Sequence, residues 1–355
     1  METIISTEFK LTQYSHGAGC GCKIAPQVLD SILKSNLAAP DNKNLIVGNS
    51  SKDDAAVYDL GNGTALISTT DFFMPIVDDP YSFGRIAGAN AISDIYAMGG
   101  KPILAIAILG WPIDKLPAAV AQQVIEGARS ICMEAGIPLA GGHSIDNPEP
   151  IFGLAVNGLV AKDQIKQNST AQEGDLLFLT KPLGIGLLST AQKRNLLKED
   201  DLQTMLRQLQ QLNKVGEELG AIKEVHAMTD VTGFGLLGHL VEMCEGSGTS
   251  AELDLNAVPI IPAAKEYLLQ KAIPGGTKRN WDSYGNKISF AASIAQFEAM
   301  NLLADPQTNG GLLIAVGKEG EQKVKTLLEK NSLYGNIIGK IVKAKDKPVN
   351  VKDAQ

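Results

Sequence analysis

A glycine-rich run near the start of the sequence places two thiols beside a lysine. The run reads His16-Gly17-Ala18-Gly19-Cys20-Gly21-Cys22-Lys23. Because nearby cationic side chains and a following helix start stabilise a thiolate, we predict a lowered thiol pKa for Cys20 or Cys22. The thiolate is the reactive form, so either residue could act as a nucleophile or bind a soft atom. Lys23 offers a point charge for a phosphate group.

Two simpler interpretations of this run stay open. It could belong to a loose N-terminal tail with incidental cysteines, since chain termini are commonly poorly ordered. It could also hold zinc, but one residue separates Cys20 from Cys22, whereas structural zinc pairs are usually separated by about two to four. The other cysteines, Cys132 and Cys244, fall in predicted helices and are expected to be buried packing residues.

Aspartates at the boundaries of predicted elements form a second group. Asp53-Asp54 precedes a predicted strand, Asp71 ends one and Asp230 precedes a glycine-rich turn, while Asp94 lies inside a predicted helix one turn after Asn90. A single aspartate in such a place is usually a cap or a solvated side chain. Asp94 differs, because an unpaired carboxylate in an alanine-rich helix is costly to bury. Together these carboxylates are suitable ligands for Mg²⁺, which keeps other coordination positions for phosphate oxygens.

The segment Gly141-Gly142-His143-Ser144 is predicted to be a turn after a short apolar stretch. Backbone N–H groups in such a turn, with a hydroxyl beside them, can cradle a phosphate. A plain turn is equally compatible with its composition.

A second glycine motif, residues 233–238, matches G-x-G-x-x-G, and Asp254 follows at the distance of about 20 residues that dinucleotide-binding domains show. The preceding residues 226–232 are short and polar, where a buried parallel strand should be continuously apolar. We therefore interpret the match as a helix-opening turn that places Asp230. The sequence contains no P-loop, no kinase catalytic-loop signature and no G-x-S-x-G motif.

Alternating periodicity predicts a mixed α/β protein with two domains. Residues 1–44 are expected to be a flexible glycine-rich segment, 45–161 one α/β domain and 170–350 a second, with a polar linker over 162–174. Strands are predicted at 55–60, 65–70, 103–109, 151–160, 176–180, 312–316 and 337–342. Helices are predicted at 26–34, 81–98, 115–135, within 187–220, and at 234–244.

Composition limits the classes of function. The chain has 355 residues, a net charge of −7 and no run of Lys and Arg, so nucleic-acid binding is not expected. Such an acidic protein can still bind ATP if divalent cations lie between the two. Residues 1–10 lack the pattern of a signal peptide, and the apolar runs near 103–113 and 151–161 are shorter than the roughly 20 residues of a membrane span. With only four cysteines, we expect a cytosolic protein outside the membrane.

Residues 11–23 closely resemble the N-terminal signature of the selenophosphate synthetases, or selenide, water dikinases. The similarity continues through residues 53–58, 68–75, 90–100, 141–144 and 229–238, and so covers nearly the whole chain. The Cys-Gly-Cys-Lys segment is specific to that family. The aspartate and glycine motifs are shared more widely with aminoimidazole ribonucleotide synthetase, thiamine-monophosphate kinase and a hydrogenase maturation protein.

The resemblance implies a two-domain fold like that of aminoimidazole ribonucleotide synthetase, and a homodimer with a joint β-barrel. It implies that selenide, ATP and water give selenophosphate, AMP and orthophosphate, with Mg²⁺ as cofactor. The product would supply activated selenium for selenocysteine and selenouridine synthesis, and a protein that delivers selenium is a further partner to consider. A kinase or ligase of the same architecture, or a nucleotide-binding module without activity, remain alternatives.

The resemblance also implies roles for single residues. Cys20 resembles the catalytic cysteine, and Lys23 the catalytic lysine that contacts the phosphates. Asp54, Asp94 and Asp230 resemble the magnesium ligands. Further ATP contacts implied in this way are Ser51, Lys52, Asp53, Asp71, Asp94, Gly142, His143 and Ser144.

Overall fold

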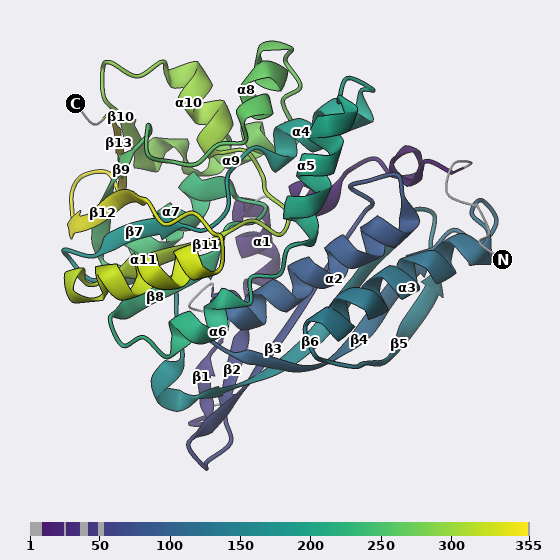
Figure 1. Ribbon diagram of the computed structural model, residues 1–355, viewed down its shortest axis with the longest axis horizontal. Helices are drawn as coiled ribbons and strands as arrows, with labels where there is room; N and C mark the ends of the chain where they lie inside the picture. The colour runs from purple at the N-terminus through teal and green to yellow at the C-terminus, as the bar shows by residue number, and fades with distance from the viewer. Residues whose placement is uncertain (1–8, 25, 36–41, 49–52, 354–355) are drawn as a thin grey trace.

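Two mixed β-sheets, each accompanied by helices, form the two halves of the molecule (Figure 1). The computed structural model describes residues 9–24, 26–35, 42–48 and 53–353. Strands of the first sheet come from residues 45–161, and those of the second from residues 176–352. The mixed α/β architecture that the alternating pattern predicts is confirmed.

The first sheet has six strands in the order β1-β2-β3-β6-β4-β5. Its central strands β3 and β6 pair antiparallel from Thr64 opposite Ala161 to Phe73 opposite Phe152. Helices α2 and α3 lie over one face (Figure 1), and side chains along β3 alternate between more and less buried positions. The elements are β1 (Leu45–Val47), β2 (Ala56–Asp59), β3 (Thr64–Phe73), α2 (Pro80–Ala97), β4 (Lys101–Trp111), α3 (Ala118–Glu134), β5 (Leu139–Asp146) and β6 (Ile151–Ala161).

The second sheet has seven strands in the order β10-β13-β9-β12-β7-β11-β8. Its strands are β7 (Leu176–Leu179), β8 (Val225–Asp230), β9 (Thr249–Asp254), β10 (Ile288–Phe290), β11 (Leu312–Val316), β12 (Ile337–Lys343) and β13 (Val349–Lys352). Its helices are α4 (Ile185–Lys193), α5 (Glu199–Gln210), α6 (Val215–Gly220), α7 (Gly235–Ser247), α8 (Pro262–Leu269), α9 (Gly275–Tyr284), α10 (Gln296–Leu303) and α11 (Glu321–Lys330).

Strand β8 decides how the G-x-G-x-x-G match is interpreted. The segment before the motif is a largely buried strand, so its polar composition did not exclude a strand. It pairs antiparallel with β11 at the edge of the sheet, with Asp230 opposite Leu312. A dinucleotide-binding unit requires a parallel strand followed by its helix. The motif instead opens α7 directly after Asp230, as the helix-opening interpretation predicts.

Helix α2 joins the two halves. Asp79 caps its N-terminus through a 2.7 Å hydrogen bond from a backbone N–H group. The helix packs against α3 on one side and against α5, α6 and β8 of the second half on the other. A Cβ atom added at Gly84 would lie 1.8 Å from the carbonyl oxygen of Val124, so α2 and α3 approach backbone to backbone. The alanine-rich helix predicted around Asp94 is present, and it lies between the two halves.

The glycine-rich N-terminal segment lies against both halves through two short 3-10 helices, η1 (Leu11–Tyr14) and η2 (Gly19–Cys22). The backbone N–H of Gly19 donates to the carbonyl of Met74 in the first half at 3.0 Å. The guanidinium of Arg279, in the second half, donates to the carbonyl of Gly21. Residues 9–24 are thus packed and do not form a loose tail. Helix α1 (Pro26–Leu33) follows.

Most predicted elements are present, but residues 141–144 are not a turn. They lie within β5, which pairs in parallel with β4.

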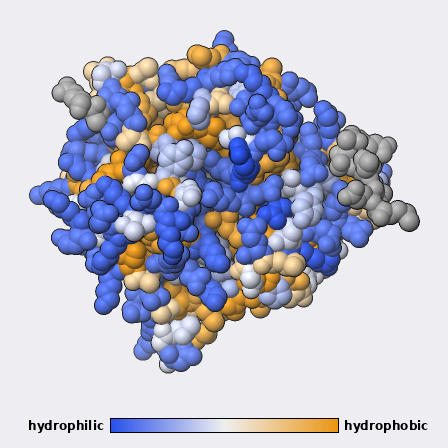
Figure 2. Space-filling model, viewed as in Figure 1, coloured by the Kyte–Doolittle hydropathy of each residue, from blue (hydrophilic) through white to orange (hydrophobic). Residues whose placement is uncertain are grey.

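On the face of the molecule shown in Figure 2, hydrophilic residues predominate and apolar residues form scattered patches. None of the helices in the described ranges combines the length and apolar character needed to cross a membrane.

Candidate functional site

A cavity of about 910 Å³ lies between the two halves, with walls from both. The first half contributes β2, β3 and α2, and the second contributes the end of β8 and the residues that lead into α7. Aspartates line the cavity together with Lys23 of the N-terminal segment: Asp53, Asp54, Asp71, Asp94 and Asp230. The structure thus brings to one site the acidic residues that the sequence places on separate elements.

The carboxyl groups of Asp54, Asp94 and Asp230 are close enough to influence one another. The hydroxyl of Thr229 donates to Asp54 Oδ1 at 2.8 Å, and that of Thr69 donates to Asp94 Oδ2 at 2.5 Å. Burial raises the pKa of all three groups, that of Asp230 to about 6, and nearby aspartates raise those of Asp54 and Asp94 further. One oxygen of Asp54 and one of Asp230 lack a hydrogen-bond partner in the described part of the chain.

These buried oxygens fit a hard divalent cation. Within residues 9–24, 26–35, 42–48 and 53–353, no group of three or more His, Cys, Asp or Glu side chains is arranged so that it could hold a metal ion by itself. Mg²⁺ does not require one, because it usually keeps several positions for phosphate oxygens and water. The unpartnered oxygens of Asp54 and Asp230, with Asp94 near them, are donors of the kind that Mg²⁺ prefers.

Asp53 has a different environment from Asp54. Its Oδ1 accepts a 2.8 Å hydrogen bond from the backbone N–H of Asn168, in the segment that joins the two halves. Burial nevertheless raises the pKa of Asp53 to about 6. Asp53 therefore links the edge of the cavity to the connecting segment through this hydrogen bond. Its other oxygen has no hydrogen-bond partner in the described residues.

The thiol of Cys20 is buried beside this cavity, with 1% of the residue exposed. Its Sγ donates to Asn90 Oδ1 at 3.3 Å, and the Asn90 amide donates to Asp71 at 2.6 Å. The backbone N–H of Cys20 donates to the hydroxyl of Thr308 at 3.0 Å. Gly19 has φ 51° and a Cβ there would lie 2.5 Å from that hydroxyl, so glycine is required directly before Cys20.

The prediction of a lowered thiol pKa is wrong for both cysteines. Burial raises the pKa of Cys20 well above its usual value and the charge of Asp71 raises it further, against the opposing effect of Lys23. Burial also raises the pKa of Cys22. His16 does not compensate, because its ring pairs with Glu149 at 2.9 Å. In this conformation Cys20 is a neutral thiol.

Lys23 stands at the edge of the cavity with 39% of its side chain exposed. Its Nζ lies 3.5 Å from Asp71 Oδ2. Burial disfavours its charge, but Asp71 and then Cys20, Asp94 and Asp230 raise its pKa above the usual value. The ammonium group is therefore held in its charged form at the mouth of an acidic cavity.

A buried loop over residues 305–311 holds Cys20 and was not predicted from the sequence. Thr308 binds the Cys20 backbone, and the N–H of Asn309 donates to Asn90 Oδ1 at 2.7 Å. The ammonium of Lys181 donates to the Asn309 carbonyl at 3.0 Å. The signal available was the run Asp-Pro-Gln-Thr-Asn-Gly-Gly before an apolar strand, whose composition is typical of a surface loop.

Some predicted ATP contacts are not at this cavity. Gly142, His143 and Ser144 are exposed on β5, which β6 and β4 separate from β3, and they do not line the cavity. Their role as ATP contacts stays a prediction. Ser51 and Lys52 lie outside the described residues.

Comparison with known proteins identifies the family. Residues 52–160 match the model of the N-terminal domain of AIR synthase related proteins, and residues 172–352 match that of the C-terminal domain. A selenide, water dikinase of Aeromonas hydrophila is 61% identical over 94% of this chain and 96% of the relative. Those of Yersinia pseudotuberculosis and Colwellia psychrerythraea are 57% and 56% identical, over 96% and 97% of this chain and 96% and 99% of the relatives. The chain belongs to the selenide, water dikinase family.

Solved structures with low sequence identity share the fold. A thiamine-monophosphate kinase of Stenotrophomonas maltophilia superposes with a TM-score of 0.65 at 20% identity, covering 88% of this chain and 92% of that one. A hydrogenase maturation protein HypE in complex with ATP superposes with a TM-score of 0.65 at 18% identity, covering 97% and 95%. These likenesses establish the two-domain AIR synthase-like architecture of this selenide, water dikinase family member.

The loop that holds Cys20 contains a carboxyl group whose protonation can be tested. Asp305 is fully buried, accepts from the backbone N–H of Gly186 at 2.9 Å and from the Gln307 amide at 2.8 Å. Burial raises its pKa from 3.8 to about 8, although these hydrogen bonds lower it. Its stabilising contribution is complete below pH 3.8 and is lost as pH rises through about 8.

We predict that Asp305→Asn becomes progressively more stable relative to the wild type as pH rises, because asparagine does not ionise. Urea unfolding of both proteins at about pH 5.5 and pH 8.5 should show this difference growing by on the order of 1–3 kcal/mol. Asp346→Asn, at an exposed loop position, is the matched control and should show no such trend. A wild-type-to-variant difference that is equal at both pH values would contradict the assignment.

Proposed function

We propose that this chain is an ATP-dependent selenide, water dikinase that converts selenide, ATP and water into selenophosphate, AMP and orthophosphate. The observation that carries the proposal is the position of the Cys20–Lys23 segment. It lies at the edge of a cavity lined by buried aspartates, and its thiol and ammonium group flank Asp71. Relatives of 56–61% identity carry this activity in their names, and they match nearly the whole chain.

The cavity supports phosphoryl transfer mainly through position and charge. We infer that Asp54, Asp94 and Asp230 hold Mg²⁺, which when bound would neutralise phosphate oxygens in a site that otherwise repels them. Lys23 supplies a positive charge at the edge of the same cavity. Asp71 holds Lys23 in place and is itself held by Asn90, so the ammonium group is oriented before a nucleotide arrives.

Cys20 would act on the selenium side of the reaction. Its proton lies on Sγ, directed at Asn90 Oδ1, because burial disfavours the thiolate. A neutral thiol can donate a hydrogen bond to an incoming chalcogenide anion without adding a like charge. We therefore propose that Cys20 positions selenide next to Lys23, where the transferred phosphoryl group also lies. The glycine-rich segment would open between the two transfers to admit water.

We further infer a homodimer that uses the face of the first sheet opposite α2 and α3. Within one chain this sheet is open, and the register aligns Phe72, Ile108 and His143 across that face. Phe72 and Ile106 are 48% and 41% exposed, which is unusual for large apolar side chains on a central strand. A second copy would cover this face and produce the joint barrel that the family resemblance implies.

The proposed setting is the cytoplasm, since all four cysteines are free thiols and a reducing compartment preserves them. A protein that delivers selenium would be a partner at the Cys20 side of the site.

We predict that Cys20→Ser removes selenophosphate synthesis. Phosphorus NMR of an anaerobic reaction with ATP, Mg²⁺ and selenide should show selenophosphate, orthophosphate and AMP in equal amounts for the wild type. The variant should be slower by about 100-fold or more, because the hydroxyl is a poor match for selenium. Cys132→Ala, which removes a buried thiol in α3 that does not line the acidic cavity, should retain activity. Unchanged AMP formation in Cys20→Ser would favour a kinase or ligase of the same fold.

We also predict that Ile106→Glu separates the dimer. A charge on the apolar sheet face would be buried without a partner on association. Light scattering coupled to size exclusion should give two chain masses for the wild type and one for the variant. Met133→Glu is the control, because Met133 is 77% exposed on α3, over the other face. Two chain masses for Ile106→Glu, or one for the wild type, would contradict the proposed interface.

A further inference from the structure

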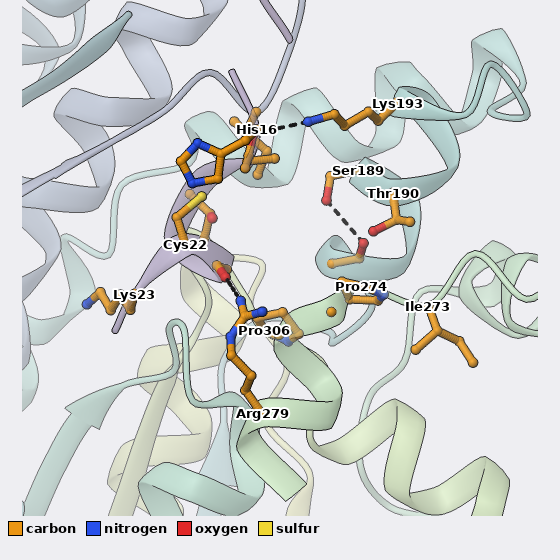
Figure 3. A pocket seen from close by; sticks show the side chains of 18 of the residues that line it. His16, Cys22, Lys23, Ser189, Thr190, Lys193, Ile273, Pro274, Arg279 and Pro306 are labelled. Atoms are coloured by element: carbon orange, nitrogen blue, oxygen red, sulfur yellow. Dashed lines mark hydrogen bonds between the residues drawn. The ribbon is translucent and has the colours of Figure 1, made fainter. Parts of the chain in front are cut away.

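A second cavity, of about 650 Å³, lies on the other side of the Cys20 segment. Figure 3 shows His16, Cys22 and Lys23 along one wall and Ser189, Thr190 and Pro274 along the facing wall. The facing wall comes from α4 and from the start of α9, both in the second half. Lys23 lines both this cavity and the acidic cavity, so the two meet at that residue.

The charges of this second cavity are all positive. Four cationic side chains line it, and neither Asp nor Glu does: Lys23, Lys193, Arg194 and Arg279. This is the reverse of the acidic cavity and of a chain whose net charge is −7. We call it the cationic cavity. A concave surface with one sign of charge concentrates small ions of the opposite sign.

The cationic side chains are held by neutral groups. Lys193 Nζ donates to the carbonyl of Ser15 at 3.0 Å, and an Arg194 guanidinium nitrogen donates to the carbonyl of Lys271 at 2.8 Å. Arg279 donates to the carbonyl of Gly21. In the described part of the chain, no carboxylate forms an ion pair with Lys193, Arg194 or Arg279. Their charge is therefore available to a ligand.

Other groups in the wall are also suited to an anion. Helix α9 begins at this wall, its first residues Gly275 and Gly276 line the cavity, and no side chain caps its N-terminus. The backbone N–H groups there are directed outward from the positive end of the helix dipole. The hydroxyls of Ser189 and Thr190 line the same wall.

The cationic cavity borders the segment that carries the reacting thiol. Cys22 lines the cavity, and the charges of Lys193 and Arg279 act on the Cys22 sulfur, against a smaller opposing effect of Glu149. A separate small cleft of about 10 Å³ is lined by Cys20, Lys23 and Arg279. Arg279 and Lys23 thus border both the cationic cavity and the cleft at Cys20. Only the segment from Cys20 to Lys23 would therefore separate a small anion in the cationic cavity from the buried thiol of Cys20.

We propose that the cationic cavity is the docking site of the anionic selenium substrate, and that this anion reaches Cys20 from the side opposite the nucleotide. The inference rests on the proposed function, which requires a chalcogenide anion to meet ATP. The acidic cavity would repel a free chalcogenide anion, because its walls carry Asp53, Asp54, Asp71, Asp94, Asp230 and Glu242. The two substrates would therefore arrive at Lys23 from cavities of opposite charge.

The first test is kinetic and uses Arg194→Gln, because the hydrogen bond described for Arg194 is to the carbonyl of Lys271, whereas Lys193 and Arg279 bond to the backbone of the Cys20 segment. The KM for selenide should rise about threefold to tenfold, while the KM for ATP should be unchanged. Lys318→Gln, an exposed cation that lines neither cavity, should change neither value. An unchanged KM for selenide in Arg194→Gln, or an equal rise for both substrates, would overturn the proposal.

The second test needs no turnover, so it separates failure of this inference from failure of the proposed function. Of the four cysteines, Cys22 alone is not buried. The measured quantity is the rate of Cys22 alkylation by anionic iodoacetate divided by the rate with neutral iodoacetamide. This ratio should fall severalfold in Arg194→Gln and in Arg279→Gln, because each substitution removes a positive charge from the cavity. A ratio that does not change would overturn the proposal. A second outcome would also overturn the proposal: Arg194→Gln is inhibited less by orthophosphate than the wild type is, but its KM for selenide is unchanged. That outcome would mean that the cavity binds phosphate.

Discussion

The site depends on several carboxyl groups that are buried in one cavity. Among the described residues, the cationic side chains there are too few to balance their negative charge. Asp54, Asp94 and Asp230 each carry a raised pKa because water is excluded and because their neighbours are also acidic. Lys23 pairs with Asp71 and only partly offsets the charges of Asp94 and Asp230. A fold does not keep unpartnered buried oxygens without cost, so their presence indicates a ligand that brings positive charge.

The position of the N-terminal segment follows from the same arrangement. Asn90 stands on α2 between Asp71 and Cys20 and so connects the acidic wall to the thiol. On the other side of the segment the charge is reversed, and Arg279 holds the backbone of Gly21. The segment thus separates an acidic cavity from a cationic one. Two substrates that are both anions could share one reaction centre because each has its own charge environment.

Much of this arrangement could be predicted from the sequence, and the failures have physical causes. Regular alternation identified α2 and the strand that carries Asp71, because burial of one face imposes a period. The strand that ends at Asp230 was missed, because its composition is polar although the strand is buried. The thiol pKa was predicted in the wrong direction, since adjacent residues indicate charge but not the burial that dominates it. The composition of the loop around Thr308 is typical of surface sequence, because several of its polar groups are satisfied by distant residues such as Asn90. Residues 141–144 read as a turn because their pairing with β4 is not local.

The most direct test of the central claim is the binding of a non-hydrolysable ATP analogue with and without Mg²⁺, measured by calorimetry on the wild type and on Asp230→Asn. The account predicts that removing Mg²⁺ weakens binding to the wild type by at least about tenfold, because the buried carboxylates then repel the triphosphate. In Asp230→Asn that ratio should shrink, since the substitution removes both a repelling charge and a cation ligand. Equal affinity of the wild type with and without Mg²⁺ would contradict the account.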